Sequence, residues 1–251
     1  MTVDPELLAS LRYEDFKDLA KQAGLSQHER IGFPDAYREG HEEAILSDLR
    51  LKAFNLDSPG CSVMDIGCGC GALAGHLMEF CRSRQHRLTM VDSEEVLARL
   101  PEARHVVLVP GRFPQETATA LSGLSGAVDV VLAYSVFHYV VSDANPFDFI
   151  DRALELLAPM GQLLVGDIPN LSMRRRFFSS AAGKAYHRAF TDTDTDPEVV
   201  FNVLAPMSID DSVLLAVVSR ARSTGFDAYL LPQHPDLPMA NRREDLLFRR
   251  P

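Results

Sequence analysis

The sequence contains only four cysteines, and they lie close together. All of them fall between Cys61 and Cys81, and no second cluster follows. The disulfide framework of a small secreted domain is therefore excluded. Cys68 and Cys70 are separated by a single residue, which is not the C-x-x-C spacing of zinc or thioredoxin-like sites. We expect reduced thiols, no bound metal and a cytoplasmic location.

Long hydrophobic runs are also missing from the chain. No apolar segment approaches the roughly 20 residues that a membrane-spanning helix needs. The first ten residues are acidic and lack the apolar core of a secretion signal. The sequence therefore predicts a soluble protein that is neither secreted nor inserted into a membrane.

Positive charge is in the minority. Lys and Arg number 25 against 35 Asp and Glu, which gives a formal net charge of -10. Non-specific binding of nucleic acid needs a dominant basic face, so no nucleic-acid partner is expected. The chain has 251 residues, of which 46% are hydrophobic. That length is enough to bury a sizeable core in one large domain or two.

Three stretches of the chain differ in their hydrophobic pattern. Residues 1–58 are predicted to be helical and to form an N-terminal cover. Over residues 59–251, short apolar runs alternate with amphipathic segments, which indicates βαβ units and a buried parallel sheet. An insert at about 169–207 interrupts this alternation, and we expect it to form part of the acceptor site. The expected strands are Ser62–Gly67, Arg87–Asp92, Val106–Pro110, Val128–Ala133, Gln162–Val165, Phe226–Leu231 and Glu244–Arg249.

These expected elements define the fold class. The last two strands have no helix between them, which predicts an antiparallel hairpin at an edge of the sheet. We therefore expect an α/β protein with a doubly wound, mostly parallel seven-stranded sheet and a C-terminal antiparallel hairpin strand. Right-handed crossovers bring the loops at the carboxyl ends of the parallel strands to one edge, where a ligand should bind.

The most informative segment is the glycine-rich turn of residues 67–71, Gly-Cys-Gly-Cys-Gly, between the first strand and a helix. Glycines let the backbone turn sharply and approach a ligand closely, and the start of the helix presents free amides. The next strand ends in Asp92, whose carboxylate can accept hydrogen bonds from two ribose hydroxyls. Together these features predict an adenosine-containing cofactor.

The glycines alone do not decide which cofactor binds. Gly67, Gly69 and Ala72 also match the dinucleotide fingerprint, so a nicotinamide-dependent oxidoreductase, NAD- or NADP-linked, stays open. Two features favour another cofactor. Asp65 lies just before the first glycine, where a carboxylate would face a cationic amino group rather than a pyrophosphate. The terminal hairpin also differs from the all-parallel second half of a dinucleotide domain.

At these residues the sequence resembles the class I, Rossmann-like S-adenosylmethionine-dependent methyltransferases. Residues 65–71 match the first motif of that family, and Asp92 stands where its ribose-binding acid stands. Residues 129–138 and 157–164 resemble its fourth-strand motif and the junction between helix and fifth strand. The resemblance covers roughly residues 60–168. It implies an enzyme that uses S-adenosyl-L-methionine and releases S-adenosyl-L-homocysteine, and it leaves the methyl acceptor open.

The resemblance also implies a set of cofactor-binding residues. Asp65 and the glycine-rich turn would hold the methionine part, and Asp92 and Ser93 the ribose. Arg112 stands where the family often has an acid for the adenine amino group; since arginine cannot accept a hydrogen bond, backbone atoms and Phe113 would contact the ring. The complete expected set is Asp65, Gly67, Cys68, Gly69, Gly71, Asp92, Ser93, Arg112, Phe113, Tyr134 and Ser135.

The acceptor side is predicted from residues beyond the fourth and fifth strands. A hydroxyl acceptor needs a general base, and His138 and Asp167 are the catalytic candidates. Each also has a structural interpretation, His138 as a donor to a loop carbonyl and Asp167 as a helix cap or loop brace. Ser135 lies near His138, but no G-x-S-x-G elbow supports a hydrolase. The expected substrate-binding residues are Tyr37, Tyr139, Arg174 and Arg175.

The predicted reaction is therefore O-methylation of a small molecule, a sugar or a secondary metabolite. An N-methyltransferase and a non-catalytic module that keeps the cofactor pocket remain alternatives. The arginines at positions 174–176 are expected either to clamp an anionic group of the acceptor or to form a solvated helix face. The insert and the N-terminal helices are expected to close over the acceptor as a lid. The sequence leaves the oligomeric state open, a homo-oligomer included.

Overall fold

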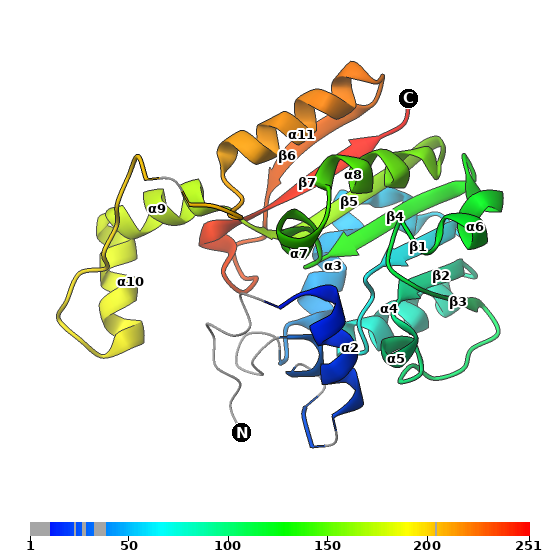
Figure 1. Cartoon of the computed structure of the whole chain (residues 1–251), viewed down its shortest axis with the longest axis horizontal. Coiled ribbons are helices and arrows are strands. Elements are labelled where there is room, and N and C mark those ends of the chain that lie inside the picture. Colours follow the sequence, from blue (N-terminus) through cyan, green and yellow to red (C-terminus); the bar gives the residue numbers. More distant parts are fainter. Residues whose placement is uncertain (1–10, 23, 27–28, 33–38, 204) are drawn as a thin grey trace.

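A single seven-stranded sheet organises the computed structural model, which describes residues 11–22, 24–26, 29–32, 39–203 and 205–251. The strand order is β3-β2-β1-β4-β5-β7-β6, with β7 antiparallel to both of its neighbours and the other pairs parallel (Figure 1). This confirms the expected fold class. The strands are β1 (Ser62–Ile66), β2 (Arg87–Asp92), β3 (Val106–Pro110), β4 (Val128–Tyr134), β5 (Leu157–Pro169), β6 (Asp227–Pro232) and β7 (Arg243–Arg249).

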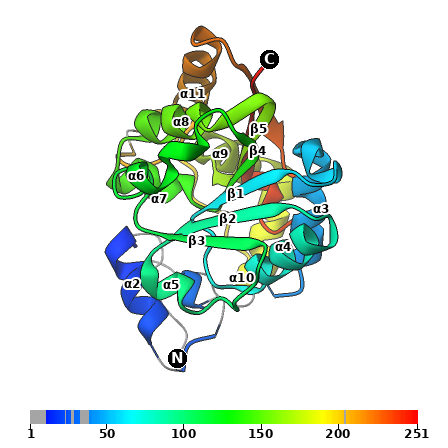
Figure 2. The ribbon, with the colours of Figure 1, turned by 90° about the vertical axis from the view of Figure 1, so that its right-hand side faces the viewer.

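Helices cover both faces of the sheet, and each face has its own apolar core. Figure 2 shows α3 and α4 on one side of the strands and α6, α7 and α8 on the other. Ile45 and Leu77 belong to the first core, whereas Phe137, Phe149 and Leu214 belong to the second. The helices of these layers are α3 (Glu42–Lys52), α4 (Ala72–Ser83), α5 (Glu94–Leu97), α6 (Ala118–Leu121), α7 (Phe137–Asp143), α8 (Pro146–Glu155) and α11 (Asp211–Ser223).

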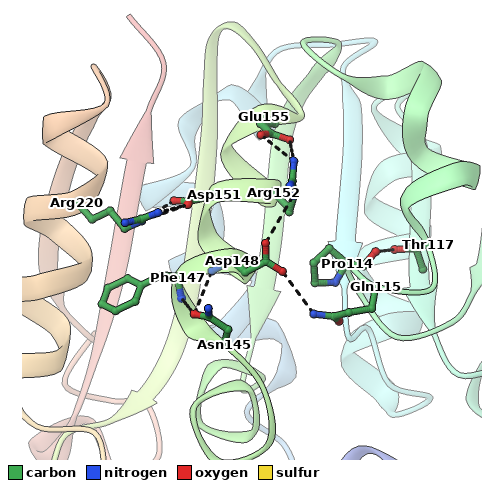
Figure 3. Close-up of polar contacts among 10 residues, drawn as sticks. All are labelled: Pro114, Gln115, Thr117, Asn145, Phe147, Asp148, Asp151, Arg152, Glu155 and Arg220. Atoms are coloured by element: carbon green, nitrogen blue, oxygen red, sulfur yellow. Dashed lines mark hydrogen bonds and ion pairs between the residues drawn. The ribbon is translucent and has the colours of Figure 1, made fainter.

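Helix α8 shows how local sequence sets an element in place (Figure 3). The Asn145 side chain accepts hydrogen bonds from the backbone N–H groups of Phe147 at 3.0 Å and Asp148 at 3.4 Å, and a proline opens the first turn. This is the combination that starts a helix well. On the outer side of α8, Asp151 pairs with Arg220 of α11 at 2.6 Å. The two helices are thereby joined over the same face of the sheet.

The N-terminal residues and the insert add helices around this core. Helix α2 (Tyr13–Lys21) and the short helix η1 (Glu29–Ile31) precede α3. The insert contains two helices, α9 (Leu171–Ser179), which carries the arginines for which a helix face was one expectation, and α10 (Ala181–Thr191), which was not predicted. Figure 1 shows this helical pair extending away from the sheet. No helix in the described part of the chain is long and apolar enough to cross a membrane.

Strand β5 is longer than predicted and is irregular at its carboxyl end. It pairs with β4 on one side and with β7 on the other, and its register against β7 shifts between Val165 and Ile168. Such a bulge bends the strand and re-aims its side chains. Asp167, within the bulge, has a φ of 60°. The irregularity therefore lies at the edge of the sheet where a ligand was expected.

We predict that replacing Phe248→Ala destabilises the protein by about 3–5 kcal/mol, because the ring is fully buried in the sheet core and its loss leaves a cavity. Equilibrium unfolding in urea measures the change. The matched control is Leu215→Ala on α11, whose side chain is 57% exposed, and which should change the unfolding free energy by no more than about 0.5 kcal/mol. Equal losses in the two variants would contradict this account of the core.

Candidate functional site

A cleft opens at the carboxyl ends of β1, β2 and β4. Its empty space, counted out to the open mouth, is about 1220 Å³. The walls come from the turn after β1, the end of β2, the loop after β3, the turn after β4 with α7, and helix α2. These are the loops that right-handed crossovers gather at one edge of a parallel sheet.

The glycine-rich turn forms the floor of the cleft. Gly67 and Gly69 have φ values of 70° and 62°, in the left-handed region that glycine adopts without strain. A Cβ on Gly67 would lie only 2.6 Å from Cγ2 of Val136, in the turn after β4. Gly71 then precedes the first turn of α4. Gly67 is therefore required both by its backbone conformation and by the close approach of the neighbouring turn.

Two carboxylates lie at the ends of neighbouring strands beside this turn. Asp92 accepts hydrogen bonds from the N–H groups of Gly69 at 2.9 Å and Ser93 at 2.7 Å. Burial raises the pKa of Asp92 to about 6 in spite of these two donors. Burial and the nearby charge of Asp92 raise the pKa of Asp65 to about 7. Within the described part of the chain, the Asp65 carboxylate has neither a hydrogen-bond donor nor a cation as its partner.

The loop after β3 closes the far end of the cleft. Arg112 donates from Nη2 to the backbone oxygen and the carboxylate of Asp143, at 2.7 and 2.9 Å, and lies over the ring of Tyr13. Phe113 lines the cleft and meets Phe149 edge-to-face, with 5.3 Å between ring centroids. Arg112 is thus engaged with the protein, while the two phenylalanine rings offer an apolar wall.

Four residues of the N-terminal region line the cleft although no sequence motif pointed to them. Tyr13 and Phe16 reach it from α2, and Phe16 meets Tyr139 of α7 edge-to-face at 4.7 Å. Arg30 lines the cleft as well, and its Nε is buried without a hydrogen-bond partner. Buried Glu42, at the start of α3, completes this wall. Their place depends on how the N-terminal region folds back, which local patterns do not reveal.

Most of the expected cofactor residues meet at the cleft. The turn after β1, Asp92, the loop after β3, Tyr134 and Ser135 all contribute to its walls. Asp65 and Ser93 lie next to it without belonging to its described lining. The Ser93 hydroxyl accepts a hydrogen bond from the N–H of Val96 at 3.3 Å and so caps α5. That capping role was not predicted.

The expected acceptor residues are more scattered. Tyr139 lines the cleft, whereas neighbouring His138 is half-buried, outside the described lining, with its ring 3.9 Å from that of Tyr139. Asp167 is buried and pairs with Arg243 at 2.6 Å, as the bracing interpretation anticipated. Arg174 and Arg175 do not reach the described lining: Arg174 lies over Phe178, and Arg175 donates to the backbone oxygen of Val203. Tyr37 falls outside the described residues.

Comparison with protein families identifies the domain. Residues 64–163, which include the glycine-rich turn, β4 and the start of β5, match the family model of a methyltransferase domain. These residues therefore form a methyltransferase domain, and the sheet agrees with the fold of the class I S-adenosylmethionine-dependent methyltransferases. The sheet order, with an antiparallel β7 beside β5, also differs from a dinucleotide-binding domain. The oxidoreductase alternative therefore has no support from the matched domain or from the sheet order.

Solved structures of methyltransferases share this fold. The plantazolicin methyltransferase BpumL in complex with SAH has 16% sequence identity and a TM-score of 0.57, with 98% of each chain covered. A SAM-dependent methyltransferase from Aquifex aeolicus has 12% identity and a TM-score of 0.53, covering 96% of this chain and 100% of its own. A putative methyltransferase from Haloferax volcanii, in complex with the Trm112 methyltransferase activator, has 13% identity and a TM-score of 0.52 at the same coverage. No curated protein matches the sequence significantly.

We predict that Gly67→Ala weakens binding of S-adenosylhomocysteine about tenfold or more, because the added Cβ would strain the backbone and displace Val136. Isothermal titration calorimetry measures the dissociation constant. Gly75→Ala in α4 is the control, since its Cβ would meet nothing within 4 Å. The control should bind like the wild type and be more stable by up to about 1 kcal/mol. An unchanged affinity in Gly67→Ala would show that the turn tolerates a side chain.

Proposed function

We propose that the cleft binds S-adenosylmethionine with its amino-acid end between Asp65 and Arg30. One observation carries this proposal. The buried Asp65 carboxylate lies next to the cleft and the buried Nε of Arg30 lies on its wall, each without a described protein partner. Buried charges need compensation. The ammonium group of a bound amino acid would compensate the negative charge of Asp65, and its carboxylate would compensate the positive charge of Arg30. S-adenosylmethionine supplies a methyl group that its sulfonium sulfur already activates for transfer.

The rest of the cleft suits the nucleoside half of the cofactor. Each oxygen of Asp92 accepts one backbone N–H, which leaves acceptor capacity for the two ribose hydroxyls. Phe113 and Phe149 offer apolar surface to the adenine. Because Arg112 is engaged with Asp143, we propose that backbone atoms of this loop, rather than the Arg112 side chain, contact the base.

Binding of S-adenosylhomocysteine is expected to depend on pH. The ammonium group needs an ionised Asp65, whose pKa in the free protein is about 7. Affinity should therefore rise as the pH rises toward about 7.5, and fall by up to about tenfold for each pH unit below 7. Asp65→Asn should bind weakly throughout and lose most of this dependence. Titration calorimetry across pH measures both effects, and an affinity independent of pH would contradict the assignment.

The same carboxylate links stability to pH in the protein without ligand. Its pKa is raised on folding, so the unfolded chain ionises first and the folded state becomes less stable as the pH rises from about 4 to about 7. Asp65→Asn should remove this part of the decline. Thermal unfolding of the ligand-free proteins therefore provides an independent check on the pKa of Asp65.

We further propose that the acceptor is a small molecule, a sugar or secondary metabolite, methylated at a hydroxyl. His138 is the proposed general base, because it neighbours Tyr139 at the cleft wall and its ring packs against that tyrosine. Tyr134 and Tyr139 would bind the acceptor. Asp167 is not assigned proton transfer, since its carboxylate is paired with Arg243.

A nitrogen acceptor is the second candidate, and the pairing of Asp167 favours it. Of the two bases on which the hydroxyl prediction depends, one is held by a guanidinium and accepts a hydrogen bond from Ser135. A neutral amine carries its own lone pair and needs no base to attack the methyl carbon. Such an acceptor would require orientation and exclusion of water more than proton transfer.

His138→Gln distinguishes the two candidates. With a hydroxyl acceptor the substitution should lower kcat by about a hundredfold or more, because the base is lost. With an amine acceptor kcat should change little, and S-adenosylhomocysteine should bind equally well in either case. The measurement is transfer of a radiolabelled methyl group to panels of sugars, phenols and amines. Loss of cofactor binding in this variant would contradict both readings of His138.

Three further points stay predictions. We propose that the insert, with α9 and α10, forms an outer part of the acceptor site and acts with the N-terminal cover as a lid. A cytoplasmic location, expected from the few clustered cysteines, and a homo-oligomeric state also stay predictions.

A further inference from the structure

A buried group of charged side chains lies behind the turn that follows β4. Asp167 is at its centre. Its carboxylate accepts a hydrogen bond from the Ser135 hydroxyl and pairs with Nη1 of Arg243 at 2.6 Å. The same Nη1 also donates to the backbone oxygen of Asp167 at 3.1 Å. The N–H of Asp167 donates to Oδ1 of fully buried Asp245, which in turn pairs with Lys52 at 2.5 Å.

Ser135 and Asp167 share an unusual backbone conformation. Both have a φ of 60°, in the left-handed region that side-chain-bearing residues rarely adopt. The N–H of Ser135 donates to the backbone oxygen of Gly166 at 2.9 Å, so the two strained residues are tied by backbone as well as side chain. Residues in this region persist only where the surrounding structure holds them. The ion pair of Arg243 with Asp167 is the charged restraint among them, beside a hydrogen bond from Gln233 Nε2 to the same carboxylate at 3.2 Å.

The conformation of Ser135 determines where the next residues lie. Val136 follows it directly and packs against Gly67 of the cofactor turn. Helix α7 begins one residue later and carries Tyr139 and Val140 into the cleft wall. A change of φ at Ser135 would therefore move the wall that faces the glycine-rich turn.

We propose that Arg243 is a positioning residue for cofactor binding, which acts through Asp167 to hold Ser135 in its left-handed conformation and so places the turn after β4 against the cleft. This inference rests on the proposed assignment of the cleft to S-adenosylmethionine. Arg243 is outside the described lining of the cleft. Without its guanidinium, the buried Asp167 carboxylate loses the positive charge of Arg243 and keeps neutral donors such as Ser135 and Gln233, so it turns away or takes up a proton. Ser135 then relaxes toward negative φ.

Arg243→Met tests the proposal with S-adenosylhomocysteine as the probe. The methionine retains much of the apolar stem and removes the charge. If the competent arrangement falls to about a tenth of the population, the dissociation constant rises about tenfold. Arg243→Lys should recover part of this affinity, since a single nitrogen makes both contacts with Asp167.

A second substitution separates positioning from general destabilisation. In the double variant Arg243→Met with Ser135→Gly, glycine adopts the left-handed conformation without a restraint, so the affinity should return toward the wild-type value. Arg222→Met is the control: it loses two hydrogen bonds to the backbone oxygen of Ala228, between α11 and β6, and away from the cleft. It should unfold at a lower temperature and bind the probe like the wild type.

Substitutions at Ser135 alone keep the test decisive if Arg243→Met does not fold. Ser135→Ala and Ser135→Gly both remove the hydroxyl, but only glycine keeps the left-handed backbone without strain. Positioning predicts that the alanine variant binds the probe more weakly than the glycine variant, whatever the lost hydroxyl itself contributes to binding. Equal loss in both would assign the effect to the hydroxyl itself and overturn the proposal.

Two results with Arg243 would also overturn it. One is wild-type affinity in Arg243→Met, and the other is a double variant that binds as weakly as the single one. A wild-type protein that does not bind S-adenosylhomocysteine would instead refute the cofactor assignment of the cleft, and the inference would fall with it. Titration calorimetry on the folded full-length chains distinguishes these outcomes.

Discussion

The compensation of buried carboxylates is the constraint on which the site of this methyltransferase depends. Behind the turn after β4, the protein itself neutralises Asp167 with Arg243. In front of that turn, Asp65 is buried without a described partner, and its pKa rises accordingly. A buried charge without a partner is costly. Arg243 therefore compensates the first carboxylate within the fold, and we propose that a cationic ligand compensates the second. The need to compensate a buried charge thus distinguishes Asp167, which has a partner within the protein, from Asp65, which is suited to a ligand. Both acids lie at the carboxyl edge of the same sheet.

Close approach of two turns gives the cleft its shape. The turn after β1 meets the turn after β4 at Gly67 and Val136, where no Cβ would fit. In the turn after β1, Gly67 allows this close approach and adopts its left-handed backbone without strain. On the other side Ser135 adopts a left-handed backbone and is held there by contacts from β5. One wall of the cleft therefore depends on local sequence and the facing wall on a restraint from elsewhere in the chain.

Distant segments converge on the edge where the core motif lies. Arg243 comes from the start of β7, which runs antiparallel and so begins at the carboxyl edge of the parallel strands. Lys52 comes from the end of α3, and Tyr13 and Phe16 come from α2. The terminal hairpin and the N-terminal helices thus do more than cover the sheet. Helix α2 supplies rings to the cleft, and Arg243 and Lys52 supply the charges that compensate the buried acids beside it.

Local patterns were sufficient to predict the sheet, the glycine-rich turn and the strand-end acid Asp92, because strand periodicity, glycine and chain order act over a few residues. The residues of α2 and Arg30 could not be predicted, since their place in the cleft depends on how the N-terminal region folds back. The sequence pattern placed Asp167 at the correct edge of the sheet. It could not reveal that the partner of Asp167 is Arg243, which lies 76 residues further along the chain. The sequence by itself determined where a cofactor turn forms. Only the tertiary structure decided which acids are neutralised within the protein. The cation that neutralises a buried acid is brought to it by the fold and can lie far away along the chain.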